Sequence, residues 1–264
     1  MSRESLKSVA RLIDLANKDV PVEQSFLDDL KRSIEISANK PSSHKPSLTF
    51  KPSSINCKRQ SYYFLTETEA DEPKPVSYNF AGICNSGTDI HVRIQNAVIE
   101  MQKNGIDCEW VDVEDFIKSR NLTDLTVTAK TGTETKLYNK RYNMSFMCDG
   151  VVRYRGKYYI LEFKTETSSK WHSREGVDKK HHHQGICYSL NFELDDVIFI
   201  YIDRDMLNLK SFMFHVTDEM RREIVDYIDD VNGYIKRGIV PPKEDIDRRV
   251  CQYCSYSKNC KRDK

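Results

Sequence analysis

The sequence lacks an apolar run long enough to cross a lipid bilayer. Its longest strongly apolar stretch, residues 197–202, is far shorter than the roughly 20 residues that a membrane-spanning helix needs. Residues 2–20 alternate apolar and charged side chains, including Glu4, Asp14 and Asp19, and therefore contain no continuous apolar core of a secretory signal. We expect a cytoplasmic protein without a membrane partner.

A charge imbalance is also missing. The chain carries 41 Lys and Arg against 40 Asp and Glu, a net charge of +1, so its overall charge does not indicate a nucleic-acid partner. Binding to nucleic acid would depend on local basic patches. Three groups of basic residues are candidates: Lys51, Lys58 and Arg59; Lys136, Lys140 and Arg141; Lys170, Arg174, Lys179 and Lys180.

No internal repeat is visible, and the apolar spacing predicts both helices and strands. Helices are expected over residues 5–17, 23–37, 86–101, 179–191 and 218–237, and a short one carries Cys57. Strands are expected over residues 108–113, 125–128, 150–154, 158–164, 196–203 and 212–216. Residues 129–142 and 165–178 are polar and predicted to be loops. We predict a helical extension and linker over residues 1–45, followed by an α/β domain over residues 46–264 with a mixed central sheet flanked by helices.

Residues 147–164 form the central pattern, a predicted β-hairpin with a turn at residues 155–157. We place Asp149 on its first strand and Glu162 and Lys164 on its second. Because side chains alternate along a strand, Glu162 and Lys164 share one face. Two carboxylates can hold a hard divalent cation, and the lysine can steady a water or a phosphoryl oxygen. The alternative is a merely solvated polar face, but Glu162 lies within an otherwise apolar run.

Eight cysteines in a cytoplasmic setting indicate metal ligands or buried thiols rather than disulfides. Cys251, Cys254 and Cys260 lie within ten residues of one another, in the pattern Cys-x2-Cys-x5-Cys. Four thiolates suit an iron–sulfur cluster and equally a structural zinc ion, so the ligand type leaves both open. The fourth ligand would come from one of the remaining cysteines: Cys57, Cys84, Cys108, Cys148 or Cys187.

The order of these motifs resembles the iron–sulfur branch of the PD-(D/E)XK nucleases. That branch includes RecB-like, CRISPR-associated exonucleases and the nuclease domain of AddAB-type helicase–nucleases. The matching features over residues 50–264 are, in order, Cys57 in an aromatic and basic segment, Gly87 with His91, Asp149, Glu162-x-Lys164, Gln184 with Tyr188, and the C-terminal cysteines. The proline that usually precedes the first acid is absent, since Met147 and Cys148 stand there.

The resemblance implies a role for each matched residue. His91, Asp149 and Glu162 would bind Mg²⁺ or Mn²⁺ with the backbone carbonyl of Phe163, and Lys164 would orient or activate the attacking water. Gln184 and Tyr188 would hold DNA near the scissile phosphate. Cys57, Cys251, Cys254 and Cys260 would hold a [4Fe–4S] cluster, with Zn²⁺ as the alternative.

The function expected from this resemblance is a metal-dependent DNA exonuclease acting on single-stranded ends. Its setting would be recombination, repair or phage DNA processing, with a helicase or recombination partner, in a bacterial, archaeal or phage-infected cell. Three alternatives remain open: an endonuclease of the same fold, a catalytically inactive DNA-binding or assembly module, and a zinc-ribbon interaction protein. Residues 181–183, three consecutive histidines, are interpreted as a DNA-facing stretch.

Overall fold

The computed structural model describes residues 21–41, 46–246 and 248–263. The chain forms two compact units; of the described residues, one contains 21–41 and 74–85, and the other contains 46–73 and 86 onward. The first unit includes helix α2 (Val22–Ala38), which confirms the helix predicted over residues 23–37. The helix predicted over residues 5–17 lies outside the described residues. Because the first unit also takes in residues 74–85, the predicted division at residue 45 stays a prediction.

The second unit is built on a five-stranded mixed sheet in the order β1-β5-β6-β7-β8. The strands are β1 (Cys108–Trp110), β5 (Gly150–Tyr154), β6 (Lys157–Glu166), β7 (Asp196–Asp203) and β8 (Leu209–His215). Strands β6 and β7 are parallel, and every other neighbouring pair is antiparallel. The β5–β6 turn has positive φ at Arg155 and Gly156, as a two-residue hairpin with right-handed strand twist requires.

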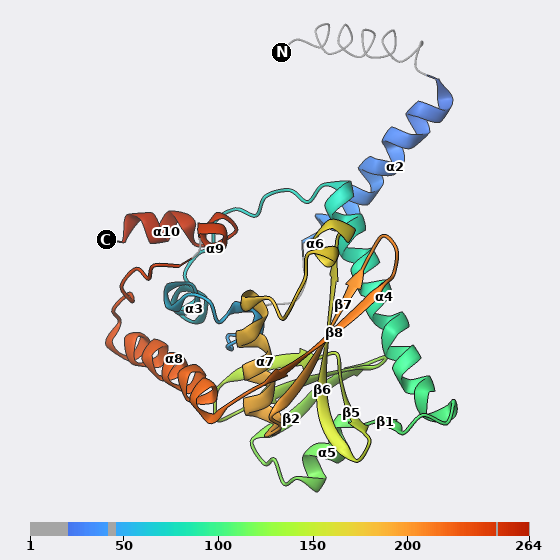
Figure 1. Ribbon diagram of the computed structural model, residues 1–264. Coiled ribbons are helices and arrows are strands. Elements are labelled where there is room, and N and C mark those ends of the chain that lie inside the picture. The colour runs from blue at the N-terminus through green and yellow to red at the C-terminus, as the bar shows by residue number, and fades with distance from the viewer. Residues whose placement is uncertain (1–20, 42–45, 247, 264) are drawn as a thin grey trace, which may run out of the picture. The chain divides into compact units, whose positions relative to one another are not determined.

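Helices cover both faces of this sheet (Figure 1). On one face, Ile90 of helix α4 (Tyr78–Lys103) packs with Leu161 and Phe163 of β6. On the other face, helices α7 (Lys179–Phe192) and α8 (Asp218–Arg237) pack on side chains such as Ile160 and Phe199. The alternation along β6 therefore separates two apolar layers, and the predicted α/β class with a mixed, helix-flanked sheet is confirmed.

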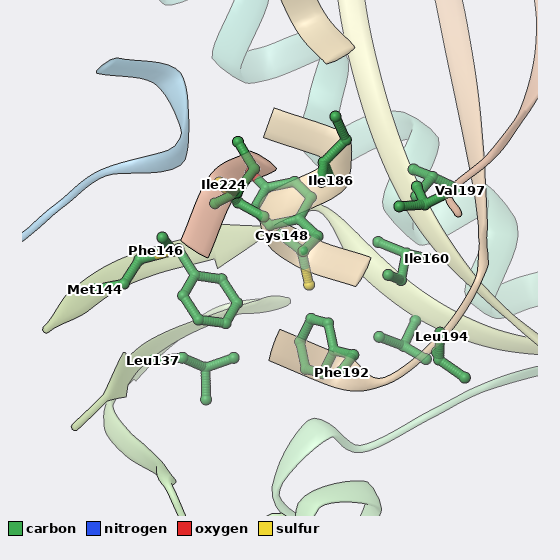
Figure 2. Packing of buried hydrophobic residues seen from close by; sticks show 14 of the residues in the cluster. Leu137, Met144, Phe146, Cys148, Ile160, Ile186, Phe192, Leu194, Val197 and Ile224 are labelled. Atoms are coloured by element: carbon green, nitrogen blue, oxygen red, sulfur yellow. The ribbon is translucent and has the colours of Figure 1, made fainter. Parts of the chain in front are cut away.

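A second, antiparallel sheet consists of β2 (Leu125–Thr131), β3 (Glu134–Asn139) and β4 (Met144–Cys148). The loop predicted over residues 129–142 is therefore wrong. Both strands carry Thr and Lys side chains at exposed or half-buried positions, which makes them resemble a polar loop in sequence. Figure 2 shows how Leu137, Phe146 and Cys148 of this sheet join the main apolar core with Phe192 of α7.

The remaining elements correct several predicted boundaries. Helix α4 begins at Tyr78 and not at the predicted residue 86, so His91 lies near its middle, and Cys84 lies in the same helix. Cys57 is the N-cap of α3 (Lys58–Leu65) and not a helical residue. Residues 165–178 are not all loop, because β6 continues to Glu166 and α6 (Ser168–His172) carries Trp171. The shorter elements are η1 (Pro52–Ser54), α5 (Val113–Ser119), α9 (Arg248–Gln252) and α10 (Ser257–Arg262).

Helix α8 has the bounds predicted for it and ends at Gly238, whose φ of 64° is the left-handed conformation that glycine adopts without strain. Among the described helices, none combines the length and the apolar character that crossing a membrane would demand.

Candidate active site

Asp149 lies at the bend where the chain passes from one sheet to the other. It follows β4 and precedes β5, so it is not on the strand predicted for it. Its Oδ2 accepts a hydrogen bond of 2.6 Å from the backbone N–H of Phe163, on the neighbouring strand β6. Its Oδ1 lies 3.2 Å from Nδ1 of His91. The bend thus directs this carboxylate toward β6 and α4 together.

Glu162 and Lys164 share one face of β6, as predicted, and helix α7 adds a third side chain. Nζ of Lys164 lies 2.5 Å from Oε1 of Glu162 and 2.9 Å from Oε1 of Gln184. Nε2 of Gln184 donates to the same Glu162 oxygen at 2.7 Å. These three side chains form a closed triangle that fixes both the carboxylate and the ammonium.

The Glu162 carboxyl is almost completely buried, with 3% of the residue exposed. Burial and, to a smaller extent, the negative charge of Asp149 raise the pKa of Glu162 to about 8, although the Lys164 ammonium opposes both effects. Desolvation and a nearby like charge disfavour the ionised form, whereas a cation beside the two acids would favour it. The two acids therefore repel each other at this site, and a positive charge beside them would relieve that repulsion.

His91 faces the same cluster from α4. Its ring stands edge-on to Phe163, with the ring centroids 5.9 Å apart. Burial lowers the pKa of His91, but the hydrogen bond to Asp149 and the negative charges of Asp149 and Glu162 outweigh burial, so the net shift is upward. The Nδ1 atom is therefore held against the carboxylate by both hydrogen bonding and charge.

Tyr188 is brought to Gln184, one helical turn away, as the i, i+4 spacing predicted. Its hydroxyl lies 2.6 Å from Nε2 of Gln184 and donates to the backbone carbonyl of Met147 at 2.7 Å. Tyr188 is only 2% exposed. In this structure its contacts orient Gln184 and link α7 to the strand that leads into Asp149, and the predicted contact with DNA stays a prediction.

One residue of the cluster was not predicted from the sequence. Gln95 lies one helical turn after His91 on α4 and is 0% exposed. Its Nε2 donates to the backbone carbonyl of Asp149 at 2.9 Å, and its Oε1 accepts from the Thr133 hydroxyl, in the β2–β3 turn, at 2.6 Å. The i, i+4 spacing from His91 was the available signal, because both residues must share one face of a helix.

Replacing Gln95 with leucine should lower the free energy of unfolding by about 1–3 kcal/mol, because a buried carbonyl and a hydroxyl lose their partner. Urea denaturation of the wild type and the variant measures this difference. Gln102→Leu, at an exposed position of the same helix, is the matched control and should change stability by less than about 0.5 kcal/mol. Equal losses in the two variants would contradict the role assigned to Gln95.

The donor set of the cluster suits a divalent cation, with two carboxylates and an imidazole on adjacent elements. Within residues 21–41, 46–246 and 248–263, no three or more His, Cys, Asp or Glu side chains stand in an arrangement ready to hold a metal ion. In the structure the Glu162 oxygen is bonded to Lys164 and Gln184 instead. Phe163 contacts this cluster through its backbone N–H, which donates to Asp149, and its carbonyl as a metal ligand stays a prediction.

The C-terminal cysteines face a separate cavity of about 190 Å³. Its lining includes Cys57, Cys251, Cys254 and Cys260, the four residues that the resemblance assigned to the cluster. All four are free thiols, and Nη1 of Arg59 lies 3.5 Å from Sγ of Cys260. Burial raises the pKa of Cys57 and of Cys254, so ligation would have to replace the proton on each. The four thiols line one cavity, although within the part of the chain that the structure describes no three of them are placed to hold a metal ion together. The predicted iron–sulfur cluster, with zinc as its alternative, stays a prediction.

The other cysteines lie elsewhere. Cys108, Cys148 and Cys187 are buried at 4%, 4% and 0% exposure in the apolar clusters of the sheet and α7. There they act as small apolar side chains.

No family model matches this chain, and no curated protein matches it in sequence. Solved structures do resemble it. The protein designated SSO0001 is 15% identical with a TM-score of 0.48, over 92% of this chain and 100% of that one. An alkaline exonuclease from Laribacter hongkongensis is 10% identical with a TM-score of 0.37, over 73% and 90%. A candidate exonuclease from Eubacterium rectale is 11% identical with a TM-score of 0.36, over 79% and 89%.

Proposed function

We propose that this chain is a metal-dependent deoxyribonuclease that hydrolyses phosphodiester bonds as an exonuclease, from single-stranded ends. The observation that carries the proposal is the convergence of Asp149, Glu162 and Lys164 on one cluster with His91 and Gln184. Two acids and a lysine in one polar cluster match what phosphodiester hydrolysis needs, namely a cation site beside a group that can position water.

In this proposal His91, Asp149 and Glu162 hold Mg²⁺ or Mn²⁺. The bound cation would neutralise charge on the scissile phosphate and lower the pKa of water. An imidazole ligand makes Mn²⁺ more acceptable than it would be in an all-oxygen site. The N–H of Phe163 and the side chain of Gln95 hold Asp149 in place from two directions, which keeps its carboxylate between β6 and His91 of α4.

Lys164 has the role of orienting the attacking water or a phosphoryl oxygen. Its side chain is 22% exposed, whereas the Glu162 side chain is 4% exposed. Gln184 accepts from the ammonium and donates to Glu162, and it therefore keeps the lysine and the acid in a set relation. Gln184 also supplies the proposed contact to DNA beside the scissile phosphate.

The four cysteines around the second cavity would hold a [4Fe–4S] cluster, or Zn²⁺ in its place. Such a group would join α3 to the C-terminal segment. These two parts of the chain are already in contact, because Arg59 donates to the backbone carbonyls of Cys260 and Asp263 at 3.1 and 2.9 Å. Its role here is structural, since it closes the two ends of the nuclease domain on each other.

The biological setting we propose is DNA processing in recombination, repair or phage replication, in the cytoplasm of a bacterial, archaeal or phage-infected cell. A helicase or recombination protein that delivers single-stranded ends is the expected type of partner.

A linear single strand labelled at either end should be degraded in Mg²⁺ or Mn²⁺, whereas a circular single strand of the same sequence should stay intact. EDTA should abolish the degradation, because the acids then lack the cation that neutralises the phosphate. Gel electrophoresis of the labelled products measures both results and gives the polarity. Cutting of the circle at the rate of the linear strand would identify an endonuclease, and activity that persists in EDTA would reject metal dependence.

A further inference from the structure

The segment between the catalytic strand β6 and helix α7 is held by a buried ion pair. Arg174 was predicted to belong to a basic surface patch, but its side chain is only 7% exposed. Its Nε lies 2.5 Å from Oε1 of Glu166 and its Nη2 lies 2.7 Å from Oε2, a two-pronged contact. Glu166 lies two residues after Lys164 on β6, so both project from the same face of the strand. The pair therefore begins directly beside the proposed site.

Tyr201 carries the connection onward. In the parallel β6–β7 pair its register partner is Lys164, so the two side chains are neighbours on one face. The guanidinium of Arg174 stacks on the Tyr201 ring, 4.0 Å from its centroid. The Tyr201 hydroxyl accepts the backbone N–H of Asp178, the N-cap of α7, at 3.0 Å.

His181 completes the connection to α7. Its Nδ1 lies 2.9 Å from the Tyr201 hydroxyl, and its ring stacks on Phe199 and Tyr201. Burial and, to a smaller extent, the nearby Lys164 and Lys180 charges lower the pKa of His181 to about 3. In a neutral imidazole ring, an unprotonated Nδ1 can accept a hydrogen bond from the Tyr201 hydroxyl. His181 is therefore held by packing in this structure, and the DNA-facing role predicted for residues 181–183 stays a prediction.

These contacts close a ring around the site. Gln184 lies three residues after His181, close to the same face of α7, and contacts Lys164 and Glu162. Thus Lys164 is joined to Gln184 directly, and also indirectly through Glu166, Arg174, Tyr201 and His181. Helix α7 cannot rotate or slide along the sheet without breaking this second path.

We propose that Arg174, held by Glu166 and stacked on Tyr201, is a positioning residue that sets helix α7 so that Gln184 meets Lys164 and Glu162. The expected effect on kcat rests on the proposed nuclease function, whereas the positioning of Gln184 by Arg174 does not depend on it. Arg174 contacts Glu166 and Tyr201 and none of Asp149, Glu162 and Lys164, so we expect it to act on turnover through the placement of Gln184. A displacement of about 1 Å in such a side chain can cost up to 10²-fold in rate.

Two conservative variants test this. Arg174→Lys keeps the charge but cannot make the two-pronged contact, and Tyr201→Phe keeps the ring but loses the hydroxyl that reaches α7. We expect kcat on single-stranded DNA to fall about 10-fold or more in Arg174→Lys and less in Tyr201→Phe, with KM within about twofold of the wild type. If one variant does not fold, the other still gives the result.

The matched control is Arg221→Lys, at the opposite end of α7. Arg221 of α8 donates to the Ser189 hydroxyl at 3.1 and 2.9 Å and pairs with Asp195 and Asp218. This variant should lose comparable thermal stability but keep its kcat. Equal kcat losses in Arg174→Lys, Tyr201→Phe and Arg221→Lys would overturn the proposal.

A second readout is independent of activity. The side-chain amide of Gln184, identified in a ¹⁵N-glutamine spectrum by its absence in Gln184→Ala, reports its hydrogen bonds to Glu162 and Tyr188. Its resonances should shift in Arg174→Lys and Tyr201→Phe and stay in place in Arg221→Lys. If the wild type cuts no DNA, the proposed function fails while this measurement still decides the positioning role. An unshifted Gln184 amide in the two test variants would reject that role.

Discussion

Glu162→Gln is expected to lower the rate of DNA cleavage by about 10³-fold or more, while the protein stays folded and still binds DNA. The amide is isosteric and can still accept from Lys164 and Gln184, so the triangle of contacts at the site can persist. What disappears is the negative charge that holds a cation beside Asp149 and pairs with the ammonium. The measurement is single-turnover cleavage of an end-labelled strand at saturating enzyme.

Glu109→Gln, at an exposed position of β1, is the control and should leave the cleavage rate unchanged. Circular dichroism and fluorescence-polarisation binding of a labelled strand separate a catalytic loss from misfolding. Full cleavage activity in Glu162→Gln would contradict the assignment of this site. If the affinity for DNA falls by as much as the cleavage rate, the role of Glu162 is substrate recognition and not catalysis.

Cys57→Ser is expected to lose the iron and acid-labile sulfide that we predict for the anaerobically purified, brown wild-type protein. A serine hydroxyl is a poor substitute for the thiolate that an iron–sulfur cluster requires. Cys251→Ser, Cys254→Ser and Cys260→Ser should behave alike, because all four residues line the same cavity. Each variant should also lose much of its thermal stability. Such a group binds only to the folded protein, so its binding free energy adds to the free energy of unfolding.

Cys84→Ser is the control for this series and should keep iron and sulfide. The lining of the cysteine cavity includes Cys57 and does not include Cys84. Elemental analysis, sulfide assay and the visible spectrum measure the outcome. Bleaching of Cys84→Ser with an intact Cys57→Ser would reverse the ligand assignment, and stoichiometric zinc without sulfide would reject the cluster.

Local pattern in the sequence was enough to predict the α/β class and most elements of the central unit. Helix α8 has its predicted bounds because the amphipathic spacing, the Gly238 stop and the two prolines after it are all local signals. The placement of Glu162 and Lys164 on one face likewise follows from the period of two along a strand. The i, i+4 spacing was sufficient to bring Gln184 and Tyr188 together.

Local signals in the sequence did not predict the polar strands or the exact boundaries of some elements. Strands β2 and β3 carry Lys and Thr at exposed or half-buried positions, which gives them the composition of a loop; their pairing with each other and with β4 makes them strands. Helix α4 begins eight residues before its predicted start at residue 86. The sequence did not indicate this extension because Gly82 and Gly87 are residues typical of turns.

By itself, therefore, the sequence determined which chemical groups this protein has and which neighbours along the chain share a face, since helical and strand periods are properties of local backbone geometry. Only the tertiary structure decided that Asp149 stands at a bend between two sheets, that Gln95 supports it, and that Cys57 shares a cavity with the C-terminal cysteines. It also decided that Arg174 is buried against Glu166 instead of lying on a basic surface. These facts depend on contacts between residues far apart in the chain, and no spacing along the sequence specifies which distant groups will pair once the core excludes water.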